Sequence, residues 1–409
     1  MRDIVTNFFD TLETRSADQR AADLAQALPA QIARAKALPG YADSLGNVDP
    51  STITDAAALA DLPVLRKSEL GKAQAANGPL GGFAGPASGF AHIFQSPGPI
   101  YEPGGASHDW WRMGRFLNAA GIGQGDIVQN CFGYHLTPAG MIFENGARAV
   151  GAAVLPAGTG QTELQARAAH DIGVTAYSGT PDYLKVILDK ADQMGLSLKI
   201  TKAAVGGGAL FPSLRQEYAD RGIACLQSYA TADLGNIAYE SPAMEGMIVD
   251  EGVIVEIVRP GTGDPVAPGE VGEVVVTTLN PDYPLIRFAT GDLSAVMGGE
   301  SPCGRTNMRI KGWMGRADQT TKIKGMFVRP EQVAELVKRH DDVGRARVIA
   351  DREGEMDVML VQLETAATET SVYEQTVLDT LKLRGRIELV PAGSLPNDGK
   401  VIEDRRSYE

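Results

Sequence analysis

The chain has 409 residues, more than the ~250–300 that one hydrophobic core usually reaches, so we expect more than one domain. Its 38 basic and 51 acidic residues give a formal net charge of −13, which argues against a broadly basic nucleic-acid-binding surface but leaves room for a local basic pocket. The sequence has no apolar run long enough for a transmembrane helix, no apolar signal core at its N-terminus, and only three scattered cysteines. We therefore expect a soluble, cytoplasmic protein that binds neither nucleic acid nor a membrane.

The N-terminal part of the chain predicts helices followed by a long loop. Apolar residues recur at helical spacing within 3–40. Residues 49–70 begin with a Ser/Thr/Asp cluster of the capping type and contain a short Ala/Leu helix that Pro63 ends. Residues 74–106 are rich in Gly, Ala and Pro, and they predict mostly loop.

From residue 108 to residue 208, helical and β-rich segments alternate. This alternation predicts a parallel sheet flanked by helices. The expected helices cover 108–121, 141–151, 162–173 and 182–195, and the expected strands lie within 127–133, 153–158, 174–179 and 202–208.

The remaining third of the chain changes character twice. Residues 246–296 contain strand-like runs separated by turn signals, which predicts a β-rich subdomain. After Gly315, the pattern becomes a short β segment, a helix, two strands and a helix at 371–384, which predicts a small α+β unit.

Taken singly, the segments that carry chemistry are compatible with ordinary structure. LPNDGK (395–400) suits any turn, and Arg287 with Asp292 suits a structural ion pair. The order of a larger set is more informative. This set comprises LADLPVLRKSEL (59–70), PAGTGQTELQ (156–165), VGGGALFPSLR (205–215), SYATADLG (228–235), GEVVVTTLNPDYPLIRFATGDL (272–293), GRADQTTKIKGMFVRPEQVAE (315–335) and LPNDGK.

In this order and spacing, the segments resemble those of the phenylacetate–coenzyme A ligases, within the adenylate-forming (acyl-CoA synthetase, AMP-binding) superfamily, over nearly the whole chain. The resemblance implies an α/β fold with a large N-terminal body at 1–314, which includes a β-rich subdomain at about 246–300. It also implies a small, mobile α+β C-terminal domain at 315–409.

The resemblance implies ATP-dependent, AMP-forming activation of a carboxylic acid, either an aryl or a small acyl acid. The acid attacks the α-phosphate of ATP to give an acyl-adenylate and pyrophosphate, and the thiol of coenzyme A then displaces AMP. Such chemistry depends on positioning and charge neutralisation. The expected small molecules are ATP, Mg²⁺, coenzyme A and the acid. The resemblance is compatible with a homodimer and leaves the oligomeric state and the identity of the acid open.

The resemblance assigns nucleotide-binding roles to six residues, of which Arg316 is described below. Gly206, Gly207 and Gly208 let the backbone approach adenine closely, and Tyr229 stacks near it. Asp292 binds both ribose hydroxyls, because a carboxylate accepts two hydrogen bonds. The structural alternatives are a plain tight turn for the glycines and a strand-end cap for Asp292.

The implied catalytic residues come from two distant segments. Thr231 and Asp233 face the α-phosphate, and Asp233 stands where the family has a longer glutamate that helps to hold Mg²⁺. Lys400, on an Asn-Asp-Gly turn that we expect to be flexible, swings in to stabilise the charge of adenylation. A solvated surface lysine is its structural alternative. Arg316 contacts ribose or phosphate.

Further residues concern motion, coenzyme A and the acid. Asp318 is the implied hinge pivot, and Lys324 with Gly325 forms the loop on the coenzyme A side. Tyr134 and His135 lie in the segment that lines the acyl pocket. Because His135 stands where the family has glycine, it would shrink the pocket or add a polar contact. An ordinary helix-end histidine is the alternative.

The sequence departs from the family at the phosphate loop. Residues 96–103 read SPGPIYEP, including Ser96, Gly98 and Glu102, where relatives have a Ser/Thr/Gly-rich loop with a lysine. Both threonines are absent, Glu102 replaces the lysine, and three prolines remove N–H donors. A carboxylate near a triphosphate would oppose binding by ~1 kcal/mol or more. Alternatively, Glu102 caps a turn in solvent.

The altered phosphate loop leaves three outcomes and three functions open. The loop moves away while Mg²⁺ and other donors hold pyrophosphate, ATP binds weakly but still turns over, or adenylation is lost. The protein is accordingly a ligase, a non-catalytic nucleotide- or acyl-CoA-binding homologue, or an adenylating enzyme with an acceptor other than coenzyme A. Lys400 and Asp292 favour turnover, and Glu102 favours the non-catalytic homologue.

A second departure concerns zinc. Where many relatives carry Cys-Pro-Cys-Gly-Arg-Thr, this chain has SPCGRT, and the segment 236–250 contains neither Cys nor His. Cys303 alone cannot make a tetrahedral site, so we predict no structural zinc.

Overall fold

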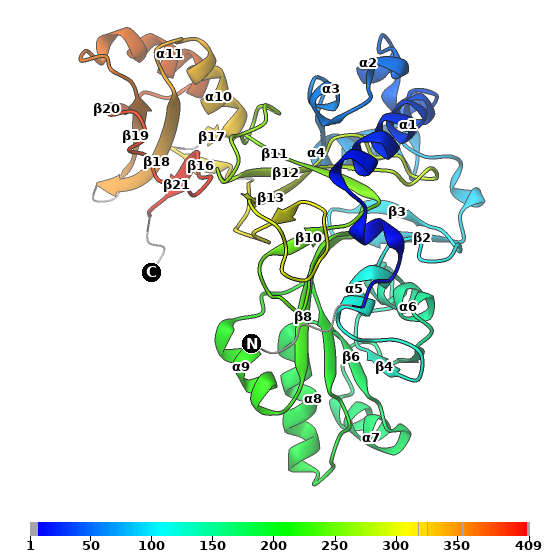
Figure 1. The fold of residues 1–409 in the computed structure, drawn as a ribbon. Coiled ribbons are helices and arrows are strands. Elements are labelled where there is room, and N and C mark those ends of the chain that lie inside the picture. The colour runs from blue at the N-terminus through cyan, green and yellow to red at the C-terminus, as the bar shows by residue number, and fades with distance from the viewer. Residues whose placement is uncertain (1–6, 318, 325, 354–355, 407–409) are drawn as a thin grey trace. The chain divides into compact units, whose positions relative to one another are not determined.

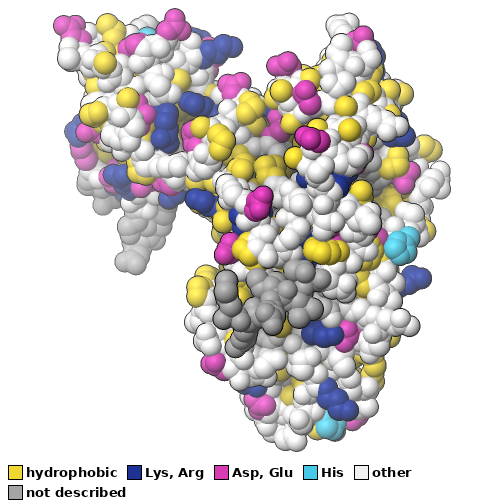
Figure 2. Space-filling view, viewed as in Figure 1, with side chains coloured by type: hydrophobic (Ala, Val, Ile, Leu, Met, Phe, Trp, Pro, Cys, Tyr) yellow, Lys and Arg dark blue, Asp and Glu magenta, His cyan; other side chains and the backbone are white. Residues whose placement is uncertain are grey.

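The computed structural model describes residues 7–317, 319–324, 326–353 and 356–406 (Figure 1). The chain divides into two compact units. The body unit comprises Met1–Val255, Val276–Phe288 and Met297–Gly312, and the C-terminal unit comprises Glu256–Val275, Ala289–Val296 and Trp313–Glu409. None of the described helices is both long and apolar enough to cross a membrane. On the face shown in Figure 2, acidic and basic side chains are interspersed.

The N-terminal part of the body unit is helical, and side chains cap the starts of α1 and α3. Ser16 accepts a hydrogen bond from the Gln19 N–H at 3.1 Å, and Asp55 accepts one from the Ala58 N–H at 2.8 Å. The α-helices are α1 (Ala17–Lys36), α2 (Ala42–Leu45), α3 (Ala56–Ala60) and α4 (Lys67–Asn77), and the 3₁₀ helices are η1 (Thr11–Thr14), η2 (Pro39–Tyr41), η3 (Pro50–Thr52) and η4 (Ala87–Gly89).

The segment predicted as mostly loop contains a β-hairpin, so that prediction is wrong. Strands β2 (His92–Ser96) and β3 (Ile100–Gly104) pair antiparallel, with Phe94 opposite Glu102. The Pro97-Gly98-Pro99 turn and Pro103 hid the strands, because proline and glycine are depleted in most strands. Helix α4 holds the hairpin through Gln74, whose side chain donates to the Tyr101 carbonyl and accepts from the Tyr101 N–H, both at 2.8 Å.

The nine-stranded sheet of the body unit confirms the predicted alternation. Its order is β14-β15-β10-β9-β8-β7-β6-β4-β5, and β4 to β8 pair parallel. Helices α7 and α8 lie side by side (Figure 1). The strands are β4 (Ile127–Asn130), β5 (Ala153–Pro156), β6 (Ala176–Gly179), β7 (Lys202–Val205), β8 (Ala224–Thr231), β9 (Gly235–Glu240), β10 (Met247–Val249), β14 (Val296–Met297) and β15 (Arg309–Ile310).

Four helices of this region lie at the predicted positions, one of them shortened, and a fifth, α9, was not predicted. They are α5 (Gly114–Ala119), α6 (Ala139–Ala149), α7 (Thr162–Ile172), α8 (Pro181–Gln193) and α9 (Pro212–Asp220). The predicted helix at 108–121 is reduced to α5, because Asp109 and Arg112 have φ values of 48° and 62°. A left-handed backbone at these positions interrupts a right-handed helix.

The predicted β-rich segment forms a four-stranded sheet of order β1-β13-β12-β11. Its strands are β1 (Leu65–Arg66), β11 (Val253–Val258), β12 (Gly272–Thr278) and β13 (Phe288–Ser294). β11 and β12 are buried along their whole length. Runs such as VIVEIV and GEVVVTT are typical of strands buried on both faces.

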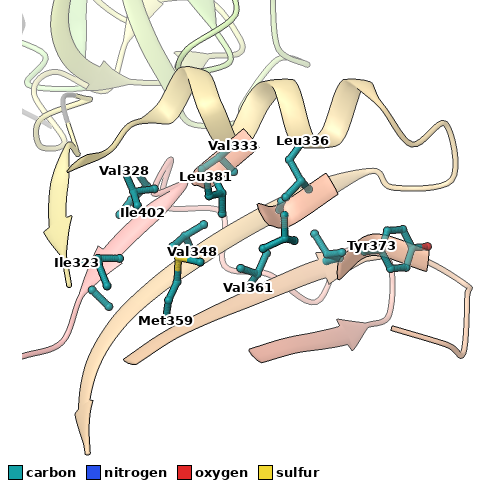
Figure 3. Packing of buried hydrophobic residues seen from close by; sticks show 14 of the residues in the cluster. Ile323, Val328, Val333, Leu336, Val348, Met359, Val361, Tyr373, Leu381 and Ile402 are labelled. Atoms are coloured by element: carbon teal, nitrogen blue, oxygen red, sulfur yellow. The ribbon is translucent and has the colours of Figure 1, made fainter. Parts of the chain in front are cut away.

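The C-terminal unit contains the predicted α+β elements. Helices α10 (Pro330–Lys338) and α11 (Ser371–Leu381) accompany a sheet of order β20-β19-β18-β21, and Figure 3 shows their apolar side chains packed together. Val333 and Leu336 of α10, Leu381 of α11 and Val348 of β18 are buried in this core. The strands are β16 (Thr321–Ile323), β17 (Met326–Val328), β18 (Arg345–Glu353), β19 (Met356–Glu364), β20 (Arg386–Val390) and β21 (Ile402–Asp404).

Candidate functional site

The carboxyl ends of β7 and β8 bring together the predicted adenine-side residues. Val205, the last residue of β7, pairs with Gln227 of β8, so Gly206 follows directly beside Ser228 and Tyr229. A Cβ on Gly206 would lie 3.1 Å from the Ser228 Oγ, and Gly207 has a φ of 67°. The glycines therefore keep bare backbone at the sheet edge where α/β folds usually bind ligands.

Aromatic side chains lie next to this glycine turn. The rings of Phe132 and Phe143 are stacked with their centroids 4.3 Å apart. A Cβ on Gly207 would lie 3.6 Å from Phe132, and one on Gly206 would lie 3.6 Å from Phe143. Sequence reasoning missed this pair, although Phe132 lies in the FGYHLTPAG segment from which Tyr134 and His135 were chosen.

The predicted acyl-pocket residues differ in their surroundings. The Tyr134 hydroxyl accepts a hydrogen bond from the Asn130 Nδ2 at 2.7 Å. Burial raises the pKa of Tyr134, so it stays a neutral phenol at physiological pH. His135 is exposed, and its carbonyl accepts a hydrogen bond from the Thr137 N–H at 2.7 Å.

A tight turn between β8 and β9 positions the predicted catalytic pair. The Thr231 Oγ1 accepts a hydrogen bond from the Leu234 N–H at 3.2 Å. Gly235 has a φ of 72°, and a Cβ there would lie 2.7 Å from the Trp111 carbonyl, so the turn requires glycine. Asp233 lies at the centre of this turn and is buried.

Only one of the two carboxylate oxygens of Asp233 has a hydrogen-bond partner among the described residues. The Lys67 Nζ donates to its Oδ2 at 2.8 Å, while its Oδ1 is buried and has no hydrogen-bond partner among the described residues. Lys67 is the first residue of α4 and was not predicted as a site residue. The LADLPVLRKSEL segment contains it, but nothing in that pattern showed that its side chain reaches Asp233.

The hairpin places Glu102 in the interior rather than in solvent. Its exposed fraction is 0%, the Ser96 Oγ donates to its Oε1, and its Oε2 has no partner among the described residues. The alternative of a solvated, turn-capping Glu102 is therefore wrong, because the residue lies inside β3 and not in the turn. The turn itself contains Gly98, which precedes a cis peptide bond to Pro99.

Electrostatics link Glu102 to Asp233. Burial, together with the negative charge of Asp233, raises the pKa of Glu102 to about 7, while the Ser96 hydrogen bond and Lys67 oppose the shift. Burial and then the charges of Asp233 and Glu102 also hold the pKa of Tyr283 well above its usual value. Tyr283 was not predicted, and its buried hydroxyl has no hydrogen-bond partner in the described part of the chain.

In the C-terminal unit, Asp292 meets two donors. The Arg316 Nη1 donates to the Asp292 Oδ1 at 2.8 Å, and the Trp313 Nε1 donates to the same oxygen at 3.0 Å. Backbone hydrogen bonds fix this arrangement: the Leu293 N–H donates to the Gly315 carbonyl at 2.9 Å, and the Ala317 N–H donates to the Gly291 carbonyl at 2.7 Å. Trp313 was not predicted, and its ring is more than half exposed.

Lys400 is exposed on a turn that several hydrogen bonds connect to its neighbours, and the expected flexibility of the turn stays a prediction. The Gln319 Nε2 donates to the Gly399 carbonyl at 2.9 Å, and the Gln319 Oε1 accepts from the Val401 N–H at 2.6 Å. The Lys400 N–H donates to Asp398, which also pairs with Arg347. Lys400 lies at the edge of a cavity of about 620 Å³ within the C-terminal unit.

The remaining predicted residues lie near the start of the C-terminal domain. Lys324 is exposed, has a φ of 47°, and its N–H donates to the Asp357 Oδ2 at 3.1 Å. Asp318 and Gly325 lie outside the described residues.

Comparison with known proteins finds relatives along most of the chain. No family model matches the chain. The phenylacetate-coenzyme A ligase of Escherichia coli (strain K12) is 29% identical over 437 residues, which cover 97% of this chain and 97% of that ligase. The phenylacetate-coenzyme A ligase of Thermus thermophilus is 29% identical over 336 residues, covering 78% and 75% respectively. The chain is thus similar to phenylacetate-coenzyme A ligases over most of its length. The resemblance predicted from the motifs is confirmed.

Solved structures agree on the fold of this ligase-like chain. The open conformation of 2-hydroxyisobutyryl-CoA ligase in complex with 2-HIB-AMP and CoA has a TM-score of 0.71 at 22% identity, covering 94% of this chain and 91% of that one. The same ligase in its thioesterification state has a TM-score of 0.69 at 23% identity, with coverages of 97% and 92%. The predicted adenylate-forming α/β fold is therefore confirmed.

Cys303 lies in the segment for which we predicted no structural zinc. In the part of the chain that the structure describes, no three or more His, Cys, Asp or Glu side chains are grouped to hold a metal ion. Cys303 is buried, with its sulfur 3.1 Å from the Ser301 Oγ. The absence of a structural zinc from this ligase-like chain stays a prediction.

Proposed function

We propose that this chain is an AMP-forming acid–thiol ligase, which uses ATP to convert a carboxylic acid to an acyl-adenylate and then to a coenzyme A thioester. The observation that carries the proposal is the placement of the glycine turn and Tyr229 beside the turn that holds Thr231 and Asp233. A surface for a flat base and a buried carboxylate thus stand together at the ends of β7 and β8.

Each unit contributes groups suited to the nucleotide. In the body unit, Gly206–Gly208 offer backbone to the base, and Tyr229 lies on the neighbouring strand β8. In the C-terminal unit, Asp292 binds the ribose hydroxyls, and the guanidinium of Arg316 both orients Asp292 and contacts ribose or phosphate. The structural alternative for Asp292, a strand-end cap, requires no exposed arginine beside it.

Thr231 and Asp233 are the residues that face the α-phosphate of ATP in this proposal. The buried Asp233 Oδ1 has no partner among the described residues, and carboxylate oxygens suit Mg²⁺, so the chain's residues fit this ion. Bound Mg²⁺ would neutralise phosphate charge. Lys67 holds the other oxygen of Asp233 and thereby fixes the direction of the free one.

The C-terminal unit supplies the groups for the two half-reactions. Lys400 is exposed and its Nζ pairs with none of the described residues, so it is available to stabilise the charge that develops on the carboxylate and α-phosphate oxygens. Asp318 would be the pivot that exchanges this lysine for the coenzyme A side, where Lys324 and Gly325 lie. The tied turn of Lys400 implies that the lysine moves with the domain and not by bending of its own loop.

The acid is an aryl or a small acyl carboxylate. The stacked Phe132 and Phe143, with the neutral phenol of Tyr134 nearby in the chain, form an apolar surface next to the glycine turn. Such a surface favours a flat or compact acid over a long polar one.

A non-catalytic nucleotide- or acyl-CoA-binding homologue is the second candidate, and the hairpin favours it. Pro97, Pro99 and Pro103 offer no N–H donors, and Glu102 presents no positive charge to a triphosphate. Delivery of the acyl group to an acceptor other than coenzyme A is a third outcome that the same experiment separates.

The test is a pyrophosphate-release screen over aryl and short-chain carboxylates with ATP and Mg²⁺, with and without coenzyme A. A ligase gives pyrophosphate and AMP, and it gives a thioester when coenzyme A is present. Pyrophosphate without any thioester indicates another acceptor. Binding of AMP or ATP by calorimetry without pyrophosphate from any acid would establish the non-catalytic homologue and overturn the proposal.

A further inference from the structure

Three buried polar atoms in the body unit lack a partner in the same small region. They are the Glu102 Oε2, the Asp233 Oδ1 and the Tyr283 hydroxyl, and none of them has a hydrogen-bond partner among the described residues. All three residues are buried. Buried polar atoms are paired in the great majority of cases, so three neighbouring exceptions indicate a missing ligand.

Helix α4 holds two of these residues in place through hydrogen bonds. Helix α4 contributes Lys67 at its first residue, which binds the Asp233 Oδ2 at 2.8 Å. Two turns further on, Gln74 of the same helix holds both backbone groups of Tyr101, the neighbour of Glu102, at 2.8 Å. One helix therefore fixes Asp233 and the strand of Glu102, and the mutual electrostatic influence of Glu102, Asp233 and Tyr283 agrees with this proximity.

The charges of the cluster do not balance when both acids are ionised. Two carboxylates face one ammonium group, and Lys67 is already bound to Asp233. The Ser96 hydroxyl donates to Glu102 but brings no charge. Buried charges are normally paired or coordinate metals. The missing ligand is therefore expected to be a cation that accepts oxygen ligands.

We propose that Glu102 and Asp233 together form a two-carboxylate site for a hard divalent cation, Mg²⁺ in the cell, in which Glu102 replaces the lost hydroxyls of the phosphate loop. Mg²⁺ is usually held by one or two carboxylates together with waters and substrate phosphates, so two acids suffice. The neutral hydroxyl of Tyr283 offers a hydrogen-bond partner to a metal-bound water. Because the cation lies between carboxylate and phosphate, the acidic replacement in the phosphate loop no longer opposes ATP.

The role in catalysis rests on the proposed function, but binding of the ion does not. The competing explanation is that Glu102 is a buried, protonated acid that needs no cation. The two explanations differ in what Glu102 contributes to metal affinity, and they can be separated without turnover.

The experiment titrates the full chain with Mn²⁺ as the probe and measures free Mn²⁺ by electron paramagnetic resonance, with and without a non-hydrolysable ATP analogue. Glu102→Gln keeps the size of the side chain and removes its charge. Asp233→Asn does the same for the other acid. Glu69→Gln is the matched control, because Glu69 is an exposed carboxylate of α4 that accepts a hydrogen bond which glutamine can also accept.

We expect Glu102→Gln and Asp233→Asn each to weaken Mn²⁺ binding at least tenfold, and Glu69→Gln to change it less than twofold. If Glu102→Gln binds Mn²⁺ as the parent does while Asp233→Asn does not, Glu102 is not a ligand and the proposal is overturned. It is also overturned if the parent binds no Mn²⁺ in either condition. Circular dichroism checks the fold of each variant, and Glu102→Asp, which retracts the carboxylate by one methylene, replaces Glu102→Gln should the latter not fold.

Failure of this inference is distinguishable from failure of the proposed function. If the protein releases pyrophosphate in the screen but Glu102→Gln leaves the Mn²⁺ affinity unchanged, the metal site is overturned and the proposed function stands. Glu102-dependent Mn²⁺ binding without pyrophosphate from any acid overturns the proposed function and leaves the metal site in place.

Discussion

Two carboxylate–cation pairs, one in each unit, use the same chemistry but differ in how many donors the carboxylate receives. In the body unit, Asp233 is paired with Lys67, whose side chain is 38% exposed, and the aspartate side chain is only 1% exposed. In the C-terminal unit, the Asp292 side chain is 10% exposed, its partner Arg316 is 57% exposed, and Trp313 supplies a second donor. Both carboxylates are buried, but one oxygen of Asp233 has no donor among the described residues, whereas one oxygen of Asp292 takes two donors.

This difference indicates different tasks for the two pairs. Buried carboxylate oxygens are normally hydrogen-bonded, so one without a donor is suited to a cation that takes oxygen ligands. A carboxylate oriented by arginine and tryptophan side chains that are themselves more than half exposed is suited to neutral hydroxyl groups that arrive from solvent. We therefore expect changes in the body cluster to act on the metal and on stability, and changes in the C-terminal unit to act on the nucleotide.

The largest effect is expected from Lys400→Ala. Removal of a transition-state charge partner should lower the rate of the adenylate-forming step by ~100-fold or more. Thioester formation from pre-made acyl-adenylate should survive, because that step needs no charge at this position. Quenched assays of each half-reaction measure the rates of adenylate formation and of thioester formation. Lys199→Ala, which changes another exposed lysine, is the control. Equal losses in both half-reactions would contradict the assignment of Lys400.

Asp292→Ala should weaken AMP binding by about 10- to 100-fold, because two charge-assisted hydrogen bonds to ribose are lost. Isothermal calorimetry with AMP measures the change. Mn²⁺ affinity without nucleotide should stay as in the parent, since the metal acids lie in the body unit. Asp171→Ala, a change to an exposed aspartate of α7, is the control. An unchanged AMP affinity would show that Asp292 is only a strand-end cap.

Glu102→Gln should alter the pH dependence of stability in metal-free protein. Because the pKa of Glu102 in the folded state is raised to about 7, the folded state binds more protons than the unfolded state between about pH 4.5 and 7. The free energy of unfolding of the parent should therefore fall across this window as pH rises, by on the order of 2 kcal/mol relative to the variant. Urea unfolding with a chelator at pH 5 and pH 8 measures it. Parallel pH profiles would show that Glu102 titrates normally.

How far the sequence could predict this molecule depended on the kind of pattern. The alternation of β4 to β7 with α6 to α8 was predictable, because buried parallel strands and amphipathic helices have distinct apolar periods. The hairpin β2–β3 was not predictable, because its prolines look like loop signals and its pairing is set by α4, through Gln74.

The site shows the same limit. Asp233, Tyr229 and the glycine turn followed from short motifs whose neighbours in the chain are also neighbours in space. Lys67 binds Asp233 from a segment far away in the chain, Tyr283 lies within the electrostatic influence of Asp233, and neither carried a pattern of its own. Phe132 and Phe143 meet only because α6 packs beside β4. Contacts between distant segments depend on the tertiary structure, and neither the composition nor the apolar periodicity of a segment predicts them.

The smallest effects compare the two pairs directly by removing the cation from each. Lys67→Met keeps most of the length of the side chain but leaves the buried Asp233 without its donor, so it should lower the free energy of unfolding by about 1–2 kcal/mol. Arg316→Met removes a more exposed cation and leaves Trp313 as a donor to Asp292, so it should change stability by less than about 0.5 kcal/mol. Urea unfolding of both variants at pH 8 with a chelator measures the difference. Saturating Mn²⁺ should recover part of the stability of Lys67→Met, since the ion supplies the missing positive charge, and should leave the stability difference between Arg316→Met and the parent unchanged. If both variants lose the same stability, or if Mn²⁺ does not recover the stability of Lys67→Met, the two pairs do not have the different roles proposed here.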